Sequence, residues 1–173
     1  MPLRISVTGP ESTGKSHLSH HLADKLGLGW VPEVARSYLN ELGRPYEEQD
    51  LSEILREQLA LENETLQHFP KGLVSDTDPL VLEVWSEFKY GRVDSAIHET
   101  VLGHRYDHYL ICDVDLPWEP DPLREHPDQR KELLDIYIAK CESYQFPYTL
   151  ISGEGDARIL AAQAAVTHLI DQL

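Results

Sequence analysis

The sequence has few cysteines, few basic residues and no long apolar runs. Two cysteines, Cys112 and Cys141, are too few for disulfides to carry the fold, which suits a reducing compartment. Lysine and arginine number 15 against 30 aspartates and glutamates, so the net charge is −15, which disfavours binding to duplex nucleic acid or anionic lipid. No apolar run approaches the ~18 residues of a membrane-spanning helix, and the first residues lack the apolar stretch of a signal peptide. We therefore expect a cytoplasmic protein that binds neither nucleic acid nor membrane.

What the sequence does contain is a regular alternation of strand-like and helix-like segments, and its 173 residues predict one domain over 1–173. Short apolar segments predict strands over residues 3–8, 30–31, 72–75, 109–112 and 148–151. Helical spacing of apolar residues predicts helices over residues 15–26, 34–42, 47–68, 79–90, 93–105, 128–144 and 156–173. The last helix should direct Ile159, Ala162, Val166, Leu169 and Ile170 inward. This alternation is typical of a three-layer α/β fold with a mostly parallel five-stranded sheet, in which ligands bind beyond the carboxyl ends of the strands.

A complete phosphate-binding motif, G-x-x-x-x-G-K-[ST], occupies residues 9–16 between the first strand and the first helix. Its glycines allow the backbone to approach phosphates, and its amide groups and the helix N-terminus attract anions. Lys15 supplies a cation for the terminal phosphates, and the Ser16 hydroxyl can bind Mg²⁺. We therefore predict ATP and Mg²⁺ as cofactors. The predicted nucleotide-binding residues are Gly9, Glu11, Ser12, Thr13, Gly14, Lys15, Ser16 and His17.

Three classes of P-loop protein are possible at this point. A GTPase needs an N-K-x-D motif, which is absent from the sequence. A motor or AAA-type ATPase usually carries two acids after an apolar strand, but residues 110–113 end in a single aspartate followed by Val114. The length of the chain and a proline-broken, arginine-bearing segment favour the third class, a small-molecule kinase with the fold of nucleoside and nucleotide kinases.

A kinase needs groups that bind Mg²⁺, position the acceptor hydroxyl and neutralise the moving phosphoryl group. We predict Lys15, Asp76, Glu33, Arg124 and Arg130 as catalytic residues, with Ser16 and Asp76 at the metal. Glu33 follows the second predicted strand and Asp76 the third, although Glu33 also suits a helix N-terminus. The two arginines belong to a lid segment of about residues 117–131, unless they are solvated surface residues.

Two further residues beside these acids have open roles. Asp78 follows Asp76 by two positions and either contacts the substrate or caps the helix that begins at Pro79. Arg36 lies one helical turn after Glu33 and either contacts the acceptor or pairs with Glu33.

These motifs together resemble the ribosylnicotinamide kinase domain of bacterial NadR proteins and the stand-alone NadR-like P-loop kinase family, whose members often bear a generic AAA-type ATPase label. The resemblance rests on residues 8–16, 32–36, 76–78, 118–124 and 147–148 and on Arg130. It implies transfer of phosphate from ATP to the 5′-hydroxyl of nicotinamide riboside, giving nicotinamide mononucleotide. It also implies a small-molecule substrate site formed by Glu33, Arg36, Asp76, Asp78, Trp118 and Asp121.

Two qualifications accompany this resemblance. Trp118 suits a cationic pyridinium ring, or else is a core or lid-hinge aromatic. The sequence has no [HT]-x-G-H signature and no DNA-binding segment, so we expect no adenylyl transfer and no transcriptional role.

Other functions remain open on the sequence alone. The alternatives are a regulatory ATPase that acts through a protein partner, a kinase of another nucleoside, and a nucleotide-binding module without catalysis. His17, His20 and His21 share one helix face, but no third metal ligand accompanies them, so we interpret this face as solvated.

Overall fold

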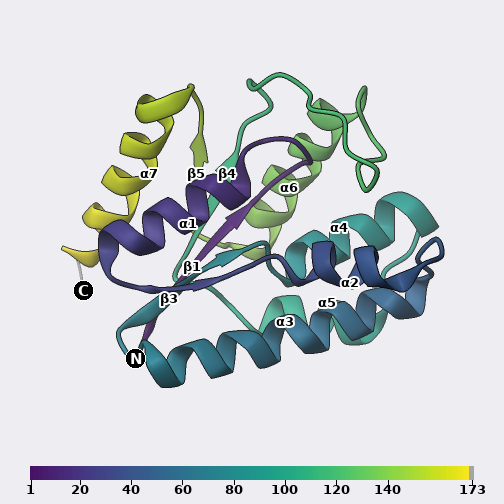
Figure 1. The fold of residues 1–173 in the computed structure, drawn as a ribbon, viewed down its shortest axis with the longest axis horizontal. Helices are drawn as coiled ribbons and strands as arrows, with labels where there is room; N and C mark the ends of the chain where they lie inside the picture. Colours follow the sequence, from purple (N-terminus) through teal and green to yellow (C-terminus); the bar gives the residue numbers. More distant parts are fainter. Residues whose placement is uncertain (172–173) are drawn as a thin grey trace.

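The computed structural model describes residues 1–171, and its centre is one five-stranded sheet. The strands are β1 (Leu3–Thr8), β2 (Gly29–Val31), β3 (Gly72–Asp76), β4 (His108–Cys112) and β5 (Tyr148–Ile151). They lie in the order β2-β3-β1-β4-β5, and every neighbouring pair is parallel. The predicted α/β fold with a parallel five-stranded sheet is therefore confirmed, and β1 lies at its centre (Figure 1).

Helices cover both faces of this sheet and complete the three layers (Figure 1). The helices are α1 (Lys15–Leu26), α2 (Val34–Leu42), α3 (Glu48–His68), α4 (Pro79–Tyr90), α5 (Ser95–Gly103), α6 (Arg130–Tyr144) and α7 (Gly155–Ile170). The helices α1 and α7 pack together on one face, whereas α3, α4, α5 and α6 form the other layer, with α2 against α3. The long irregular connection between β4 and α6 crosses the carboxyl end of the sheet (Figure 1).

The alternation of side chains along β1 explains why the two layers differ. Ile5 and Val7 point into an apolar cluster with Leu18 and Leu22 of α1. Each fully buried side chain of this size contributes roughly 1.5–3 kcal/mol. Because successive strand residues face opposite sides, Ser6 and Thr8 point toward the other layer. Both are fully buried there, so β1 places polar groups beneath α4.

Five predicted elements have the observed bounds, the ends of the others differ by one to three residues, and one side chain was predicted to face the wrong way. The α5 helix begins at Ser95 because the Asp94 side chain accepts a hydrogen bond from the Ala96 amide at 2.8 Å. Ile170 was predicted to face inward but is 42% exposed, so this prediction is wrong. The helix α7 buries one narrow face, and Ile170 lies outside it at the helix end. The last two residues of the helix predicted over 156–173 lie outside the described residues.

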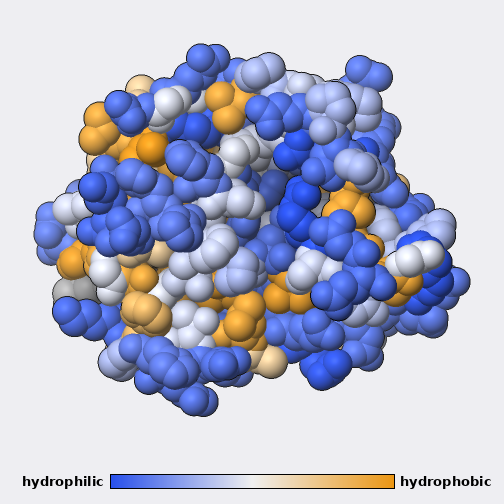
Figure 2. Space-filling model, in the orientation of Figure 1, coloured by the Kyte–Doolittle hydropathy of each residue, from blue (hydrophilic) through white to orange (hydrophobic). Residues whose placement is uncertain are grey.

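The face of the molecule seen in Figure 2 is mainly hydrophilic. Figure 2 shows hydrophobic residues scattered among hydrophilic ones on the face seen in Figure 1. Within residues 1–171, no helix combines the length and the apolar character needed to cross a bilayer. Both cysteines are buried and free, so no disulfide links the described elements.

Candidate functional site

The loop between β1 and α1 folds into a compact turn, in which two side chains bind the carbonyl group of Pro10. The Thr13 hydroxyl and the Lys15 ammonium both donate to the Pro10 carbonyl oxygen, each at 2.7 Å. Gly9 has a φ of 126°, and a Cβ at this position would lie 3.0 Å from the Cys112 carbonyl oxygen, so glycine is required. Gly14, with a φ of 75°, begins α1. The free amide groups of this helix N-terminus are therefore available to an anion.

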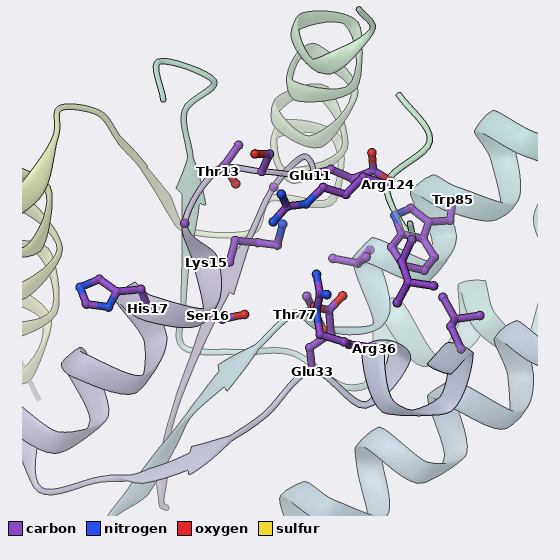
Figure 3. Close-up of a pocket in the computed structure, with 16 residues that line it drawn as sticks. Glu11, Thr13, Lys15, Ser16, His17, Glu33, Arg36, Thr77, Trp85 and Arg124 are labelled. Atoms are coloured by element: carbon purple, nitrogen blue, oxygen red, sulfur yellow. The ribbon is translucent and has the colours of Figure 1, made fainter. Parts of the chain in front are cut away.

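A cavity of about 740 Å³, partly open to solvent, lies against this loop at the carboxyl ends of the strands. It is lined by Gly9, Glu11, Ser12, Thr13, Gly14, Lys15, Ser16, His17, Glu33, Arg36, Leu39, Thr77, Val81, Trp85, Leu123 and Arg124. One wall is thus the phosphate-binding loop, and the opposite wall comes from α2, α4 and the lid segment (Figure 3).

Ser16 lines this cavity and contacts Asp76, which is buried and does not itself line it. The Ser16 hydroxyl donates to Oδ2 of Asp76 at 2.5 Å. Asp76 is 1% exposed, and its Oδ1 has no hydrogen-bond partner in the described part of the chain. Burial, reinforced by the negative charge of Glu33, raises the pKa of Asp76 to about 6. A cation at this point would satisfy the unpaired oxygen and favour the ionised carboxylate.

The oxygen chemistry of this pair fits Mg²⁺. Magnesium prefers oxygen ligands and usually binds through one or two carboxylates together with substrate phosphates and water. Within residues 1–171, no cluster of three histidine, cysteine or acidic side chains could hold a metal ion by itself, so phosphate or water would have to supply the remaining ligands. The site therefore fits a metal that arrives with a nucleotide.

Glu33 and Arg36 line the wall of the cavity opposite the phosphate loop. Arg36 Nε lies 3.9 Å from the Glu33 carboxylate, and Arg36 Nη1 donates to Asp121 at 2.9 Å. Partial burial lowers the pKa of Arg36, but the hydrogen bond to Asp121 and the charge of Glu33 raise it by more. Arg36 thus pairs with Glu33 and also connects α2 to the lid segment. In Figure 3 both side chains lie beside Thr77, away from the phosphate loop.

The two lid arginines occupy different positions. Arg124 lines the cavity and donates to the carbonyl oxygen of Glu119. Figure 3 shows Lys15 and Arg124 extending toward the same space from different elements. Arg130 is not among the lining residues, because it donates to the carbonyl oxygens of Ser12 and Leu116, each at 3.0 Å. It therefore supports the wall of the cavity from behind.

Four predicted substrate residues are absent from the residues that line the cavity: Asp76, Asp78, Trp118 and Asp121. Asp78 is 2% exposed and caps α4 through the Val81 amide at 3.1 Å. It also accepts from the Ser6 hydroxyl at 2.5 Å. Trp118 lies with its ring 5.6 Å from the Arg130 guanidinium. Of the two roles open for Asp78, its contacts show the helix cap.

Some lining residues were not anticipated from the sequence: Leu39, Thr77, Val81, Trp85 and Leu123. Thr77 has a φ of 71°, a left-handed conformation that is costly for a β-branched residue and typical of functional sites. In the sequence, only its position between two aspartates after a predicted strand indicates that Thr77 belongs to the site. Trp85 lies four residues after Val81, on the same face of α4.

Comparison with known proteins agrees with this geometry. A family model described as AAA domain matches residues 4–158. The fold is similar to a NadR protein in complex with NR, with a TM-score of 0.83 at 18% identity over 97% of this chain and 50% of that chain. It is also similar to thymidylate kinase from Ehrlichia chaffeensis, with a TM-score of 0.61 at 18% identity over 98% of each chain. Deoxyadenosine kinase from M. mycoides with bound dATP gives a TM-score of 0.58 at 16% identity over 95% of this chain and 99% of that chain.

These likenesses confirm the predicted resemblance to NadR and the fold of P-loop nucleoside and nucleotide kinases. The chain spans half the length of the NadR chain that it matches. Comparison with the curated proteins gives no match.

Proposed function

The chain belongs to the AAA domain family, and from this premise and the geometry of the cavity we propose that it is an ATP-dependent kinase of a small-molecule nucleoside. The acceptor that we propose is nicotinamide riboside, which would be phosphorylated on its 5′-hydroxyl to nicotinamide mononucleotide. The motifs that resemble NadR support this acceptor, as does the likeness to a NadR structure with NR.

One continuous cavity carries this proposal. It extends from the phosphate-binding loop and Ser16, which is hydrogen-bonded to Asp76, to Glu33, Arg36 and Trp85. The terminal phosphate of a bound nucleotide would therefore lie next to a second, walled space with carboxylate and aromatic groups. A transferase needs such a space for its acceptor, whereas simple hydrolysis needs only a water molecule.

Each residue then has a chemical task in the transfer. The acceptor hydroxyl oxygen forms a bond to the γ-phosphorus while the bond to the β–γ bridging oxygen breaks, and ADP leaves. The hydroxyl proton passes to the carboxylate of Glu33, which lines the cavity, or to that of Asp76, which contacts Ser16. Lys15 and Arg124 neutralise negative charge on the phosphoryl oxygens. Ser16 and Asp76 would hold Mg²⁺, which supplies further charge neutralisation at the phosphates.

An assay of ADP release with a panel of acceptors tests this proposal. The panel contains nicotinamide riboside, deoxyadenosine, thymidylate and a sample without acceptor. Turnover that depends on nicotinamide riboside supports the full proposal, and turnover with another nucleoside alone replaces the acceptor. A rate of ADP release that is the same with and without every acceptor instead supports a regulatory ATPase acting through a partner protein.

Two lysine variants control this assay. Lys15→Ala should abolish ADP release because it removes the cation of the phosphate loop. Lys25→Ala removes an exposed lysine at the far end of α1 and should leave the rate unchanged.

A further inference from the structure

A carboxylate stands inside the anion-binding loop. Glu11 is the third residue of the loop at residues 9–16, and it lines the same cavity as Lys15. Loop amides and a helix N-terminus attract phosphate, whereas a carboxylate at this point repels it. The charge of Glu11 must therefore be compensated by groups that are not the phosphate-binding amides.

The compensating groups belong to the lid segment. Glu11 accepts hydrogen bonds from the backbone amides of Glu125, at 3.1 and 3.3 Å to its two oxygens, and of His126, at 3.1 Å. Within residues 1–171, the Glu11 carboxylate has no other hydrogen-bond partner and forms no ion pair. Hydrogen bonds to an ionised acceptor are stronger than those between neutral groups, so two consecutive amides attach this carboxylate to the lid segment.

The neighbouring loop residue makes a second attachment. The Ser12 hydroxyl accepts from the Glu119 amide at 2.9 Å. The lid segment is thus fixed to the phosphate loop on both sides of Arg124, at residue 119 and at residues 125–126. Arg124 itself donates to the carbonyl of Glu119, and in Figure 3 its side chain lies next to Glu11.

We propose that Glu11 is a positioning residue: its carboxylate holds the lid segment on the phosphate loop and thereby fixes the Arg124 guanidinium over the cavity. The position of the lid is then set by the loop that binds the nucleotide, so an altered Glu11 acts through Arg124. The kinetic consequence rests on the proposed kinase function, whereas the attachment itself does not.

Amide hydrogen exchange, measured by NMR on the protein without nucleotide, tests the attachment. In Glu11→Ala, the Glu125 and His126 amides should exchange at least about tenfold faster than in the wild type. Glu11→Gln keeps one acceptor oxygen and should give intermediate rates. Asp128→Asn is the matched control, because it removes an exposed acid of the same segment whose side chain forms no hydrogen bond or ion pair within residues 1–171. The amides of Ile5 and Leu110, buried in the sheet, report whether each variant is folded. Unchanged exchange at residues 125 and 126 in a folded Glu11→Ala would overturn the proposal.

Kinetics test the link to Arg124. Glu11→Ala and Arg124→Ala should each lower kcat about tenfold or more, with the KM for ATP within about twofold of the wild type. The double variant should be no slower than the slower single variant, because both changes remove the same function. Multiplying effects, or a raised KM for ATP with kcat intact, would show that Glu11 contacts the nucleotide instead. A wild type without phosphotransfer would contradict the kinase function, and the exchange measurement would still decide the attachment.

Discussion

At the scale of single residues, the tryptophan that lines the cavity is not the one predicted from the sequence. Trp118 lies in the Trp-Glu-x-Asp-x-x-Arg segment and was the predicted aromatic of the nucleoside site. The structure instead places Trp85 in the cavity wall beside Arg36 and Leu123, while Trp118 stands near Arg130. Flat aromatic rings bind bases by stacking, so under the proposed function we expect Trp85 to contact the base of the acceptor nucleoside.

We expect Trp85→Leu to raise the KM for the acceptor roughly tenfold, because loss of one stacked ring costs about 1–3 kcal/mol. Leucine keeps apolar bulk at this half-buried position, and kcat at saturating acceptor should change little. Initial rates over a range of nicotinamide riboside concentrations measure the effect. Trp118→Leu serves as the comparison and should leave this KM within about twofold. The assignment fails if Trp118→Leu is the variant that weakens acceptor binding.

At the scale of elements, α3 connects the two loops that carry the acids. Gln58 of α3 is 3% exposed. Its Oε1 accepts from the Val34 amide at 3.0 Å, and its Nε2 donates to the Ser75 hydroxyl at 3.1 Å. Val34 follows Glu33, and Ser75 precedes Asp76. One buried carboxamide therefore holds the β2–α2 turn and the end of β3 at a fixed separation.

The variant Gln58→Met keeps the length of this side chain and removes both hydrogen bonds. The buried Val34 amide then lacks a partner, so the free energy of unfolding should fall by about 1–3 kcal/mol. Denaturant titration measures this as a lower midpoint with an unchanged slope. Gln67→Met, on the exposed side of the same helix, should keep the wild-type midpoint. Equal midpoints for the two variants would mean that the Gln58 bridge contributes nothing to stability.

The sequence predicts those elements whose signals are local. The phosphate loop is a contiguous motif between a strand and a helix, and Asp76 follows a short apolar strand, so both were placed correctly in the fold. Gln58 could not be found this way, because its partners lie 24 and 17 residues away along the chain. Trp85 has the helical spacing of an ordinary core residue, and only the packing of α4 against the cavity distinguishes it.

At the scale of the whole molecule, two buried carboxyl groups at the end of β3 influence stability. Burial is the main cause that raises the pKa of Asp76 and of Asp78 to about 6 each. An unfolded aspartate has a pKa near 3.9, so the folded protein holds these protons more tightly than the unfolded chain. Each group therefore contributes stability that is fully present below about pH 4 and is lost as pH rises through about 6.

The variant Asp78→Asn isolates one of these groups, because asparagine stays neutral and can still accept from the Val81 amide. As pH rises from 4 to 7, the wild type should lose up to about 3 kcal/mol of unfolding free energy relative to this variant. Denaturant titrations at pH 4.5, 5.5 and 7 measure the difference. Asp24→Asn, at an exposed position of α1, should track the wild type at all three pH values. A difference between the wild type and Asp78→Asn that stays constant with pH would contradict the burial argument.

Nucleotide binding should stabilise the whole molecule, because the phosphate loop joins its main parts. The loop continues β1, begins α1, contacts β4 at Cys112 and holds the lid segment through Glu11. A ligand that binds only the folded state at about 100 times its Kd adds about 2.7 kcal/mol, which for a chain of this size raises Tm by roughly 5–10 °C. Thermal unfolding with MgATP measures this shift.

Removing Mg²⁺ with EDTA should reduce the shift in Tm, because the Ser16–Asp76 pair then lacks its cation beside the phosphates. Lys15→Ala should abolish the shift, and Lys25→Ala should retain it. An equal shift in Lys15→Ala would place the nucleotide somewhere other than this loop.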